Sequence, residues 1–228
     1  MELLKEFMNI RGDIYNVLSV PFYKELTTGY IDVLKKYLPV IKKLSLESGN
    51  SRFTDAVNRF EPVLDTEFDK DRYDGEFAKL FLGVNKASHT GHTVTPHESV
   101  FLSHTRLVMQ EQWDEVVEIY YNNGLGKEKK FKEPEDHISA EMSFMAHMSA
   151  KTAEHIASGS APEVIRCMEV QEMFLKKHLC SWVHLLADDV RNSTYLDFYK
   201  HFPKMVECFM EADIATVEQL KEELTIVS

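Results

Sequence analysis

Carboxylates and a histidine gather in one short segment of the chain, directly ahead of a methionine-rich stretch. Glu135, Asp136 and His137 are consecutive, and Glu141 follows four residues later. Acidic side chains near a helix N-terminus each contribute about 0.3–1 kcal/mol, which accounts for Glu135 and Asp136. A cation is poorly placed at that end of a helix, so we expect His137 to be neutral or buried. His137 and Glu141 are one helical turn apart, a spacing that would also suit a shared metal ion.

Other residues with catalytic or metal-binding potential lack the spacing that such chemistry needs. His89, His92 and His97 could approach one another, but they lie in a segment without periodicity, and we expect surface histidines. Gly124-Leu125-Gly126-Lys127 lacks the spacing of a phosphate-binding loop, so we expect it to end a helix. The sequence contains no GxSxG motif. It therefore indicates no assembled catalytic site, no bound metal and no cofactor.

Helices are the elements that must position these residues. Apolar residues recur every three or four positions, as in amphipathic helices, in four stripes: Leu3-Phe7-Ile10-Ile14-Val17, Ile31-Leu34-Leu38-Ile41, Phe53-Val57-Phe60-Leu64, and Val164-Met168-Gln171-Leu175-Leu179-Trp182-Leu186. A further helix is expected after Pro96, with Met109, Trp113, Val116 and Tyr120 on one face.

The helix that follows the acidic segment is expected to begin at Pro134 and to carry Ile138, Met142 and Met145 on one face. The last helices are expected at 194–209 and 215–224. Strand-like alternation of convincing length is absent from the sequence. We therefore predict an all-α protein, a compact single-domain helical bundle over residues 1–228.

Composition and charge narrow the functional classes. The chain has 228 residues, with 26 Lys and Arg against 37 Asp and Glu, a net charge of −11, which argues against nucleic acid as a partner. Cys167, Cys180 and Cys208 show no metal-binding spacing and indicate a reducing compartment. The N-terminus lacks the features of a signal peptide, and no apolar stretch approaches about 18 residues. We expect a cytoplasmic protein.

Four segments together resemble the TorD/DmsD family, cytoplasmic chaperones of molybdoenzymes that are exported by the twin-arginine route. The first is Glu133-Pro134-Glu135-Asp136-His137 with Glu141 and the apolar helix after it. The others, in matching order and spacing, are Leu80-Phe81-Leu82-Gly83, Pro96-His97-Glu98-Ser99-Val100-Phe101-Leu102, and His178-Leu179 with Trp182. The resemblance covers the chain from about Leu80 to Met210. Ser181 stands where relatives commonly have proline.

The resemblance implies an all-helical TorD-like fold and a non-enzymatic chaperone that binds a twin-arginine signal peptide, supports molybdopterin insertion and delays export until folding is complete. A basic and apolar leader needs carboxylates beside an apolar groove. The carboxylates would be Glu98, Glu135, Asp136 and Glu141, and the apolar lining Phe81, Leu82, Met142, Met145 and Met148. Pro134, His137, Ser99, Gly83 and Trp182 complete the implied site. By burial statistics, however, methionines at this spacing belong to a core more often than to a groove.

Two functional classes remain open at this point. One is the chaperone, whose partner would be the twin-arginine leader of a molybdoenzyme catalytic-subunit precursor, with transient association at a membrane translocase. The other is a metal- or nucleotide-dependent all-helical enzyme that uses His137 and Glu141. Family members have been linked to guanine nucleotides, although no phosphate-binding motif supports a nucleotide here.

The resemblance also bears on assembly and on mutation. It allows a monomer or a homodimer that exchanges helices, with a hinge at 122–133. Substituting Asp136 or His137 is expected to weaken leader binding with little loss of stability. The identity of the client enzyme is not encoded in any motif of the sequence.

Overall fold

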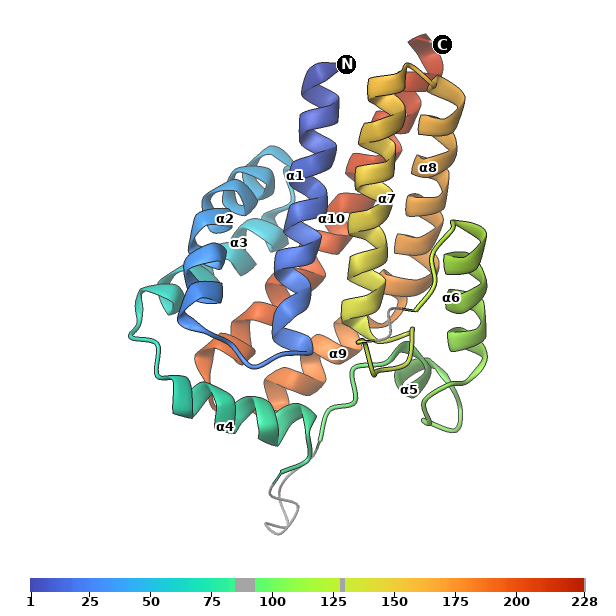
Figure 1. Cartoon of the computed structure of the whole chain (residues 1–228). Coiled ribbons are helices and arrows are strands. Elements are labelled where there is room, and N and C mark those ends of the chain that lie inside the picture. The colour runs from blue at the N-terminus through green and yellow to red at the C-terminus, as the bar shows by residue number, and fades with distance from the viewer. Residues whose placement is uncertain (85–92, 128–129, 228) are drawn as a thin grey trace. The chain divides into compact units, whose positions relative to one another are not determined.

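The computed structural model describes residues 1–84, 93–127 and 130–227 (Figure 1). Within these ranges every regular element is helical, which confirms the all-α prediction: α1 (Glu2–Ser19), η1 (Val20–Phe22), α2 (Thr28–Glu47), α3 (Ser51–Phe60), η2 (Glu61–Asp65), α4 (Lys70–Phe81), α5 (Glu98–Leu102), α6 (Glu111–Asn122), α7 (Ile138–Ser158), α8 (Ala161–Phe174), η3 (Leu175–Leu179), α9 (Cys180–Ser193) and α10 (Asp197–Val227). His89 and His92 lie outside the described residues.

Over the described residues, each helix is either too short or too polar to cross a lipid bilayer.

The chain divides into two compact units. Unit 1 consists of Met1–Ser19, Pro96–Trp182 and Ile214–Ser228, and unit 2 consists of Val20–Thr95 and Val183–Asp213. Of the four points where the chain passes from one unit to the other, two fall inside helices, α9 and α10.

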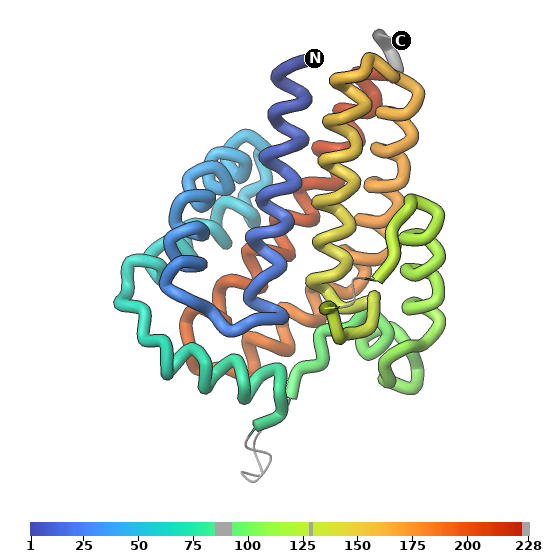
Figure 2. Tube along the Cα trace, viewed as in Figure 1, coloured from blue at the N-terminus to red at the C-terminus, as the bar shows by residue number. Residues whose placement is uncertain are grey.

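In unit 1, α1 packs along α7 (Figure 2). The approach is close at Gly12, where an added Cβ would lie 3.1 Å from the carbonyl oxygen of Ala146. The predicted apolar stripe of α1 is confirmed at Ile14, which is fully buried, but Leu3 is 82% exposed, whereas Met8 and Tyr15 outside the stripe are fully buried. The buried face of α1 is one position away from the expected one.

A buried arginine explains this error. Arg11 is only 2% exposed and donates hydrogen bonds from Nη1 to Ser149 Oγ and Gln171 Oε1. Gln171 in turn donates from Nε2 to Thr152 Oγ1 at 2.9 Å and to the Cys167 carbonyl at 3.0 Å. A charged residue is rarely buried without such partners, so apolar periodicity alone places Arg11 on the wrong face.

The apolar stripes of α2 and α3 are confirmed in unit 2, where Ile31, Leu34, Leu38 and Ile41 are buried on one face of α2. The stripe from α3 into η2 is buried likewise: Phe53, Val57, Phe60 and Leu64. Aromatic rings complete this core, with the ring centroids of Phe198 and Phe202 stacked at 5.0 Å.

The stripe from Val164 to Leu186 is also confirmed, since all seven of its residues are at most 1% exposed. The helical run that carries it changes hydrogen-bonding pattern at η3, which is a π-helical segment. Two expectations are wrong. The two last helices, expected at 194–209 and 215–224, form one helix, α10, which begins only at Asp197. The helix expected after Pro96 is interrupted by 103–110, so that Met109 lies outside α6.

Candidate functional site: a buried polar junction in unit 1

Residues 133–137 form the entry to α7. The helix begins at Ile138 and not at Pro134, because His137 is its N-cap: His137 Nδ1 accepts a hydrogen bond from the Ser139 backbone N–H at 3.1 Å. The ring proton must therefore sit on Nε2. The segment also pairs with the chain ahead of α5 in a short antiparallel bridge between His97 and His137.

Asp136 anchors α5. Its Oδ2 accepts hydrogen bonds from the Ser99 backbone N–H at 2.9 Å and from Ser99 Oγ, while its carbonyl accepts from the Glu98 N–H at 2.9 Å. Asp136 is fully buried, and Glu98 and Ser99 are at most 1% exposed. The carboxylate thus satisfies orphan donors at the N-terminus of a different helix from the one it precedes.

Glu135 anchors α6. Its Oε2 accepts a hydrogen bond from Trp113 Nε1 at 2.7 Å, and its carbonyl accepts from the Tyr120 hydroxyl at 3.3 Å. Lys127 Nζ lies 3.5 Å from the same carboxylate.

Three consecutive residues therefore hold three helices. Glu135 holds α6, Asp136 holds α5 and His137 caps α7. We call 135–137 with their partners the junction. Glu135 and Asp136 are expected from the sequence to stabilise the N-terminus of their own helix. They instead attach α6 and α5 to the entry of α7.

A second group of buried polar side chains lies behind α5. His178 Nδ1 is 2.9 and 3.1 Å from the two carboxylate oxygens of Glu98, and Trp182 Nε1 donates to Glu141 Oε2 at 3.2 Å. Trp182 also stacks on Phe101 of α5, with ring centroids 5.4 Å apart. The five-residue helix α5 is thus held by hydrogen bonds to Glu98 and Ser99 near its start and by ring stacking on Phe101 near its end.

The Glu98 and Glu141 carboxyl groups influence each other electrostatically within this group. Burial, followed by the charges of Glu98 and Asp136, raises the pKa of Glu141 well above its ordinary value. Burial also raises the pKa of Glu98, although the hydrogen bond from His178 opposes that shift. These surroundings favour the neutral form of the Glu141 carboxyl.

The junction histidines are shifted in the opposite direction. Burial lowers the pKa of His137 well below its ordinary value, and the neighbouring His97 lowers it further. His97 is only 4% exposed, so the expectation of a surface histidine is wrong there, and this burial likewise lowers its pKa. The two rings meet edge to face with centroids 4.9 Å apart. The expectation of a neutral, buried His137 agrees with this geometry.

The predicted apolar site residues are placed in different surroundings. Met142, Met145 and Met148 are fully buried in unit 1, so the structure places them in the core. Phe81, Leu82 and Gly83 belong to unit 2. Phe81 packs on neighbouring aromatic rings, whereas Leu82 is 61% exposed. Gly83 has a φ of 67°, the left-handed conformation that commonly ends a helix.

The geometry does not favour a metal shared by His137 and Glu141, because both side chains already have protein partners. In the described part of the chain, the potential ligands that converge are Glu207, Cys208 and Glu211 of unit 2. Arg52 and Lys204 form ion pairs with this group, and burial raises the pKa of the Cys208 thiol to about 11. Cations and a protonated thiol occupy the positions that a metal would need.

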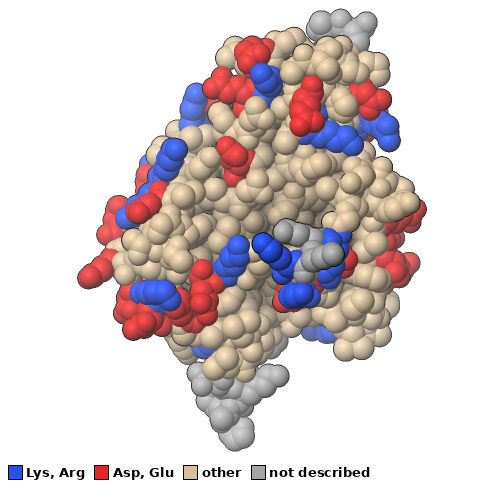
Figure 3. Space-filling view, viewed as in Figure 1, with Lys and Arg blue, Asp and Glu red and all other residues tan. Residues whose placement is uncertain are grey.

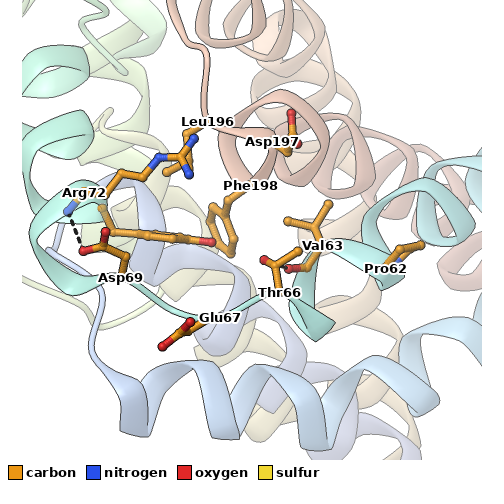
Figure 4. Close-up of a pocket in the computed structure, with 10 residues that line it drawn as sticks. Pro62, Val63, Thr66, Glu67, Asp69, Arg72, Leu196, Asp197 and Phe198 are labelled. Carbon is orange, nitrogen blue, oxygen red and sulfur yellow. Dashed lines mark hydrogen bonds between the residues drawn. The ribbon is translucent and has the colours of Figure 1, made fainter.

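Unit 2 contains a surface pocket of about 310 Å³ between η2, the start of α4 and the start of α10 (Figure 4). Tyr73 and Phe198 contribute aromatic lining, and Glu67, Arg72 and Asp197 contribute charge. The predicted site residues are not among those that line it. Asp69 at its edge accepts a hydrogen bond from the Arg72 backbone N–H and is the N-cap of α4.

Sequence reasoning missed three residues at the junction and beside it. Apolar spacing places Trp113 in a core stripe, but the side chain is only partly buried and donates a hydrogen bond to Glu135. The resemblance places His178 in a family motif, and the structure adds its bond to Glu98. Gln110 donates its backbone N–H to Ser99 Oγ at 3.3 Å and carried no sequence signal. Partners far apart in the chain leave no periodic pattern that would reveal them.

Residues 47–188 match the protein family described as "Nitrate reductase delta subunit". The match covers more than half of the chain, which therefore belongs to this family.

Curated relatives extend the similarity to nearly the whole chain. The chaperone protein TorD of Vibrio atlanticus (strain LGP32) is 25% identical over 219 residues, which cover 93% of this chain and 97% of that protein. The chaperone protein TorD of Vibrio cholerae (strain ATCC 39541) is 24% identical over 233 residues, covering 98% and 99%. That of Aliivibrio salmonicida is 24% identical over 218 residues, covering 94% and 97%. These matches confirm the resemblance noted in the sequence.

Proposed function

We propose that this chain is a non-enzymatic chaperone that binds the precursor of a molybdopterin-containing oxidoreductase by its twin-arginine leader, supports cofactor insertion and delays export until folding is complete. The observation that carries the proposal is the end-to-end similarity to proteins named as chaperones. The hydrogen bonds that His137 and Glu141 accept from other residues argue against the alternative of a metal-dependent enzyme.

The chemistry of a twin-arginine leader fits the charge of this chain. Such a leader joins a basic segment to an apolar one, and the chain carries a net charge of −11. Electrostatic complementarity of this kind gives selectivity and a fast encounter more than raw affinity. The leader directs export, so we place the chaperone in the cytoplasm, where it meets the precursor beforehand. We propose no bound cofactor, and either a monomer or a helix-exchanged homodimer as the active form.

Calorimetry with synthetic leaders tests the proposal. Peptides would be taken from the exported oxidoreductases of the native host, each with a control in which both arginines are replaced by glutamine. We expect saturable binding in the micromolar to nanomolar range for one leader, and much weaker binding for its control. Absence of heat with every leader, or turnover of a small molecule by the isolated chain, would overturn the proposal.

A further inference from the structure

Three consecutive apolar residues of unit 1 face solvent between α5 and α6. Leu107 is 61% exposed, Val108 38% and Met109 52%. They lie in residues 103–110, which we call the Leu107 loop. Single exposed apolar residues are ordinary on a protein surface, but a contiguous group marks an interaction site more often.

The backbone of this loop is strained. Arg106 has a φ of 53° and Met109 a φ of 58°, values that residues other than glycine rarely adopt. Such conformations cost free energy and persist only where surrounding contacts enforce them, which occurs most often at functional sites.

Hydrogen bonds enforce the loop conformation. The Arg106 N–H donates to Ser103 Oγ at 3.1 Å, and Gln110 Nε2 donates to the Val108 carbonyl at 3.0 Å. The Gln110 backbone N–H donates to Ser99 Oγ, which itself donates to Asp136. The loop is therefore tied to the junction, and its apolar side chains are displayed by a bonded framework.

Three carboxylates lie on α6, the helix that follows the Leu107 loop. Glu111, Asp114 and Glu118 are exposed and share one side of the helix by their spacing, and we call them the α6 acidic face. None of the three has an ion-pair partner among the described residues. The neighbouring Glu115, by contrast, is paired with Lys177 at 3.0 Å. Figure 3 shows acidic side chains over the part of the surface where Figure 1 places α6.

The dipole of α6 explains only part of this charge. Glu111 and Asp114 lie in the first turn, where acids are stabilising, but Glu118 lies beyond the range of that effect. An apolar loop beside an acidic helix face is complementary to a peptide that is apolar along one stretch and basic at one end.

We propose that the Leu107 loop and the α6 acidic face form the docking surface for the leader. The inference rests on the proposed function and names the surface that serves it. The apolar stretch of the leader packs on Leu107, Val108 and Met109, and its arginines pair with the α6 acidic face. Arg106 precedes the apolar trio and the carboxylates follow it, so the basic end of the leader points toward α6.

Charge distinguishes this occupant from a second copy of the chain. Another copy brings a net charge of −11 toward an acidic helix face, and this like-charge approach is unfavourable. A basic peptide gains from the same field.

Fluorescence anisotropy with a labelled leader that the wild-type chain binds tests the surface. We expect L107S/M109S and E111K/D114K/E118K each to weaken binding about tenfold or more. The charge-reversed variant should also lose most of the salt dependence of binding. Matched controls within unit 1 are L3S, an exposed leucine of α1, and E6K/E154K/E169K, an exposed acidic triple; both should bind within about twofold of the wild type.

A leader with both arginines replaced by glutamine refines the test. It should bind the wild-type chain weakly and lose no further affinity in E111K/D114K/E118K, because the pairing partners are already gone. Wild-type affinity in both loop and helix variants, with far-ultraviolet circular dichroism unchanged, would overturn the docking surface and leave the chaperone function standing. A wild-type chain that binds no leader would overturn the proposed function and this inference with it.

Discussion

Asp136 accepts hydrogen bonds from both the backbone N–H and the hydroxyl of Ser99, a residue 37 positions earlier in the chain. Both residues are fully buried. The sequence alone would assign this family motif to direct contact with a peptide. Its Asp136 carboxylate instead accepts hydrogen bonds inside the protein. Its effect on binding, on our proposal, passes through Ser99 and Gln110 to the Leu107 loop.

Replacing Asp136 tests this arrangement. D136A leaves the Ser99 donors without their acceptor, so we expect a loss of about 1–3 kcal/mol in the free energy of unfolding by urea. D136N keeps one carbonyl oxygen for Ser99 and should lose less. The structure therefore predicts a larger stability cost than the sequence suggested. An unfolding midpoint of D136A equal to that of the wild type would contradict the role of Asp136 as an anchor.

Glu141 gives a pH-dependent signature. A carboxyl whose pKa is higher in the folded state stabilises fully below its ordinary pKa of 4.5, and this contribution is lost as the pH rises through the raised folded pKa. The E141Q side chain cannot ionise and keeps an oxygen that can accept from Trp182 Nε1. The unfolding free energy of the wild type minus that of E141Q should therefore fall as the pH rises above about 4.5. A difference that is flat with pH would show that Glu141 titrates normally.

His137 has the opposite sign. Its lowered folded pKa means that its contribution is complete above its ordinary pKa of 6.5 and is lost as the pH falls through the folded value. H137N supplies a neutral acceptor for the Ser139 N–H and should lose less stability than the wild type on acidification. H137A removes the cap and should cost about 1 kcal/mol or more at pH 7. Parallel acid curves for the wild type and H137N would refute a neutral, capping His137.

Arg11 provides a test of the unit 1 core away from the proposed docking surface. R11A leaves Ser149 and Gln171 with fewer buried partners, and we expect it to cost about 1–3 kcal/mol in urea unfolding. The exposed Arg166 of α8 is the matched control, and R166A should change the unfolding free energy by about 0.5 kcal/mol or less. Leader binding by folded R11A should match the wild type. Equal stability of R11A and R166A would mean that Arg11 is not held as described.

Helix positions could be predicted where apolar spacing alone decides burial. The stripe from Phe53 to Leu64 follows this rule in unit 2, and the stripe from Val164 to Leu186 follows it along α8, η3 and α9. The rule failed in α1, where a buried Arg11 is satisfied by side chains of α7 and α8. No local pattern in the sequence indicates hydrogen-bond partners that lie so far along the chain.

The candidate site could be located but not interpreted from the sequence. The motif at 133–137 predicted where polar chemistry gathers, and His137 was expected to be neutral. The predicted start of the helix at Pro134 was wrong, because the His137 ring caps α7. The sequence could not show which helix each residue of 135–137 holds. Glu135 and Asp136 bond to Trp113 and Ser99, which come close to them only in the folded chain.

The attachment of three helices to three successive residues also fixes the length of the chain at this point. An inserted or deleted residue between Glu135 and His137 would shift the spacing of the anchors, so at least one of α5, α6 and α7 would lose its attachment. Relatives that share this arrangement must therefore keep these three positions contiguous, whatever variation in loop size they accept elsewhere.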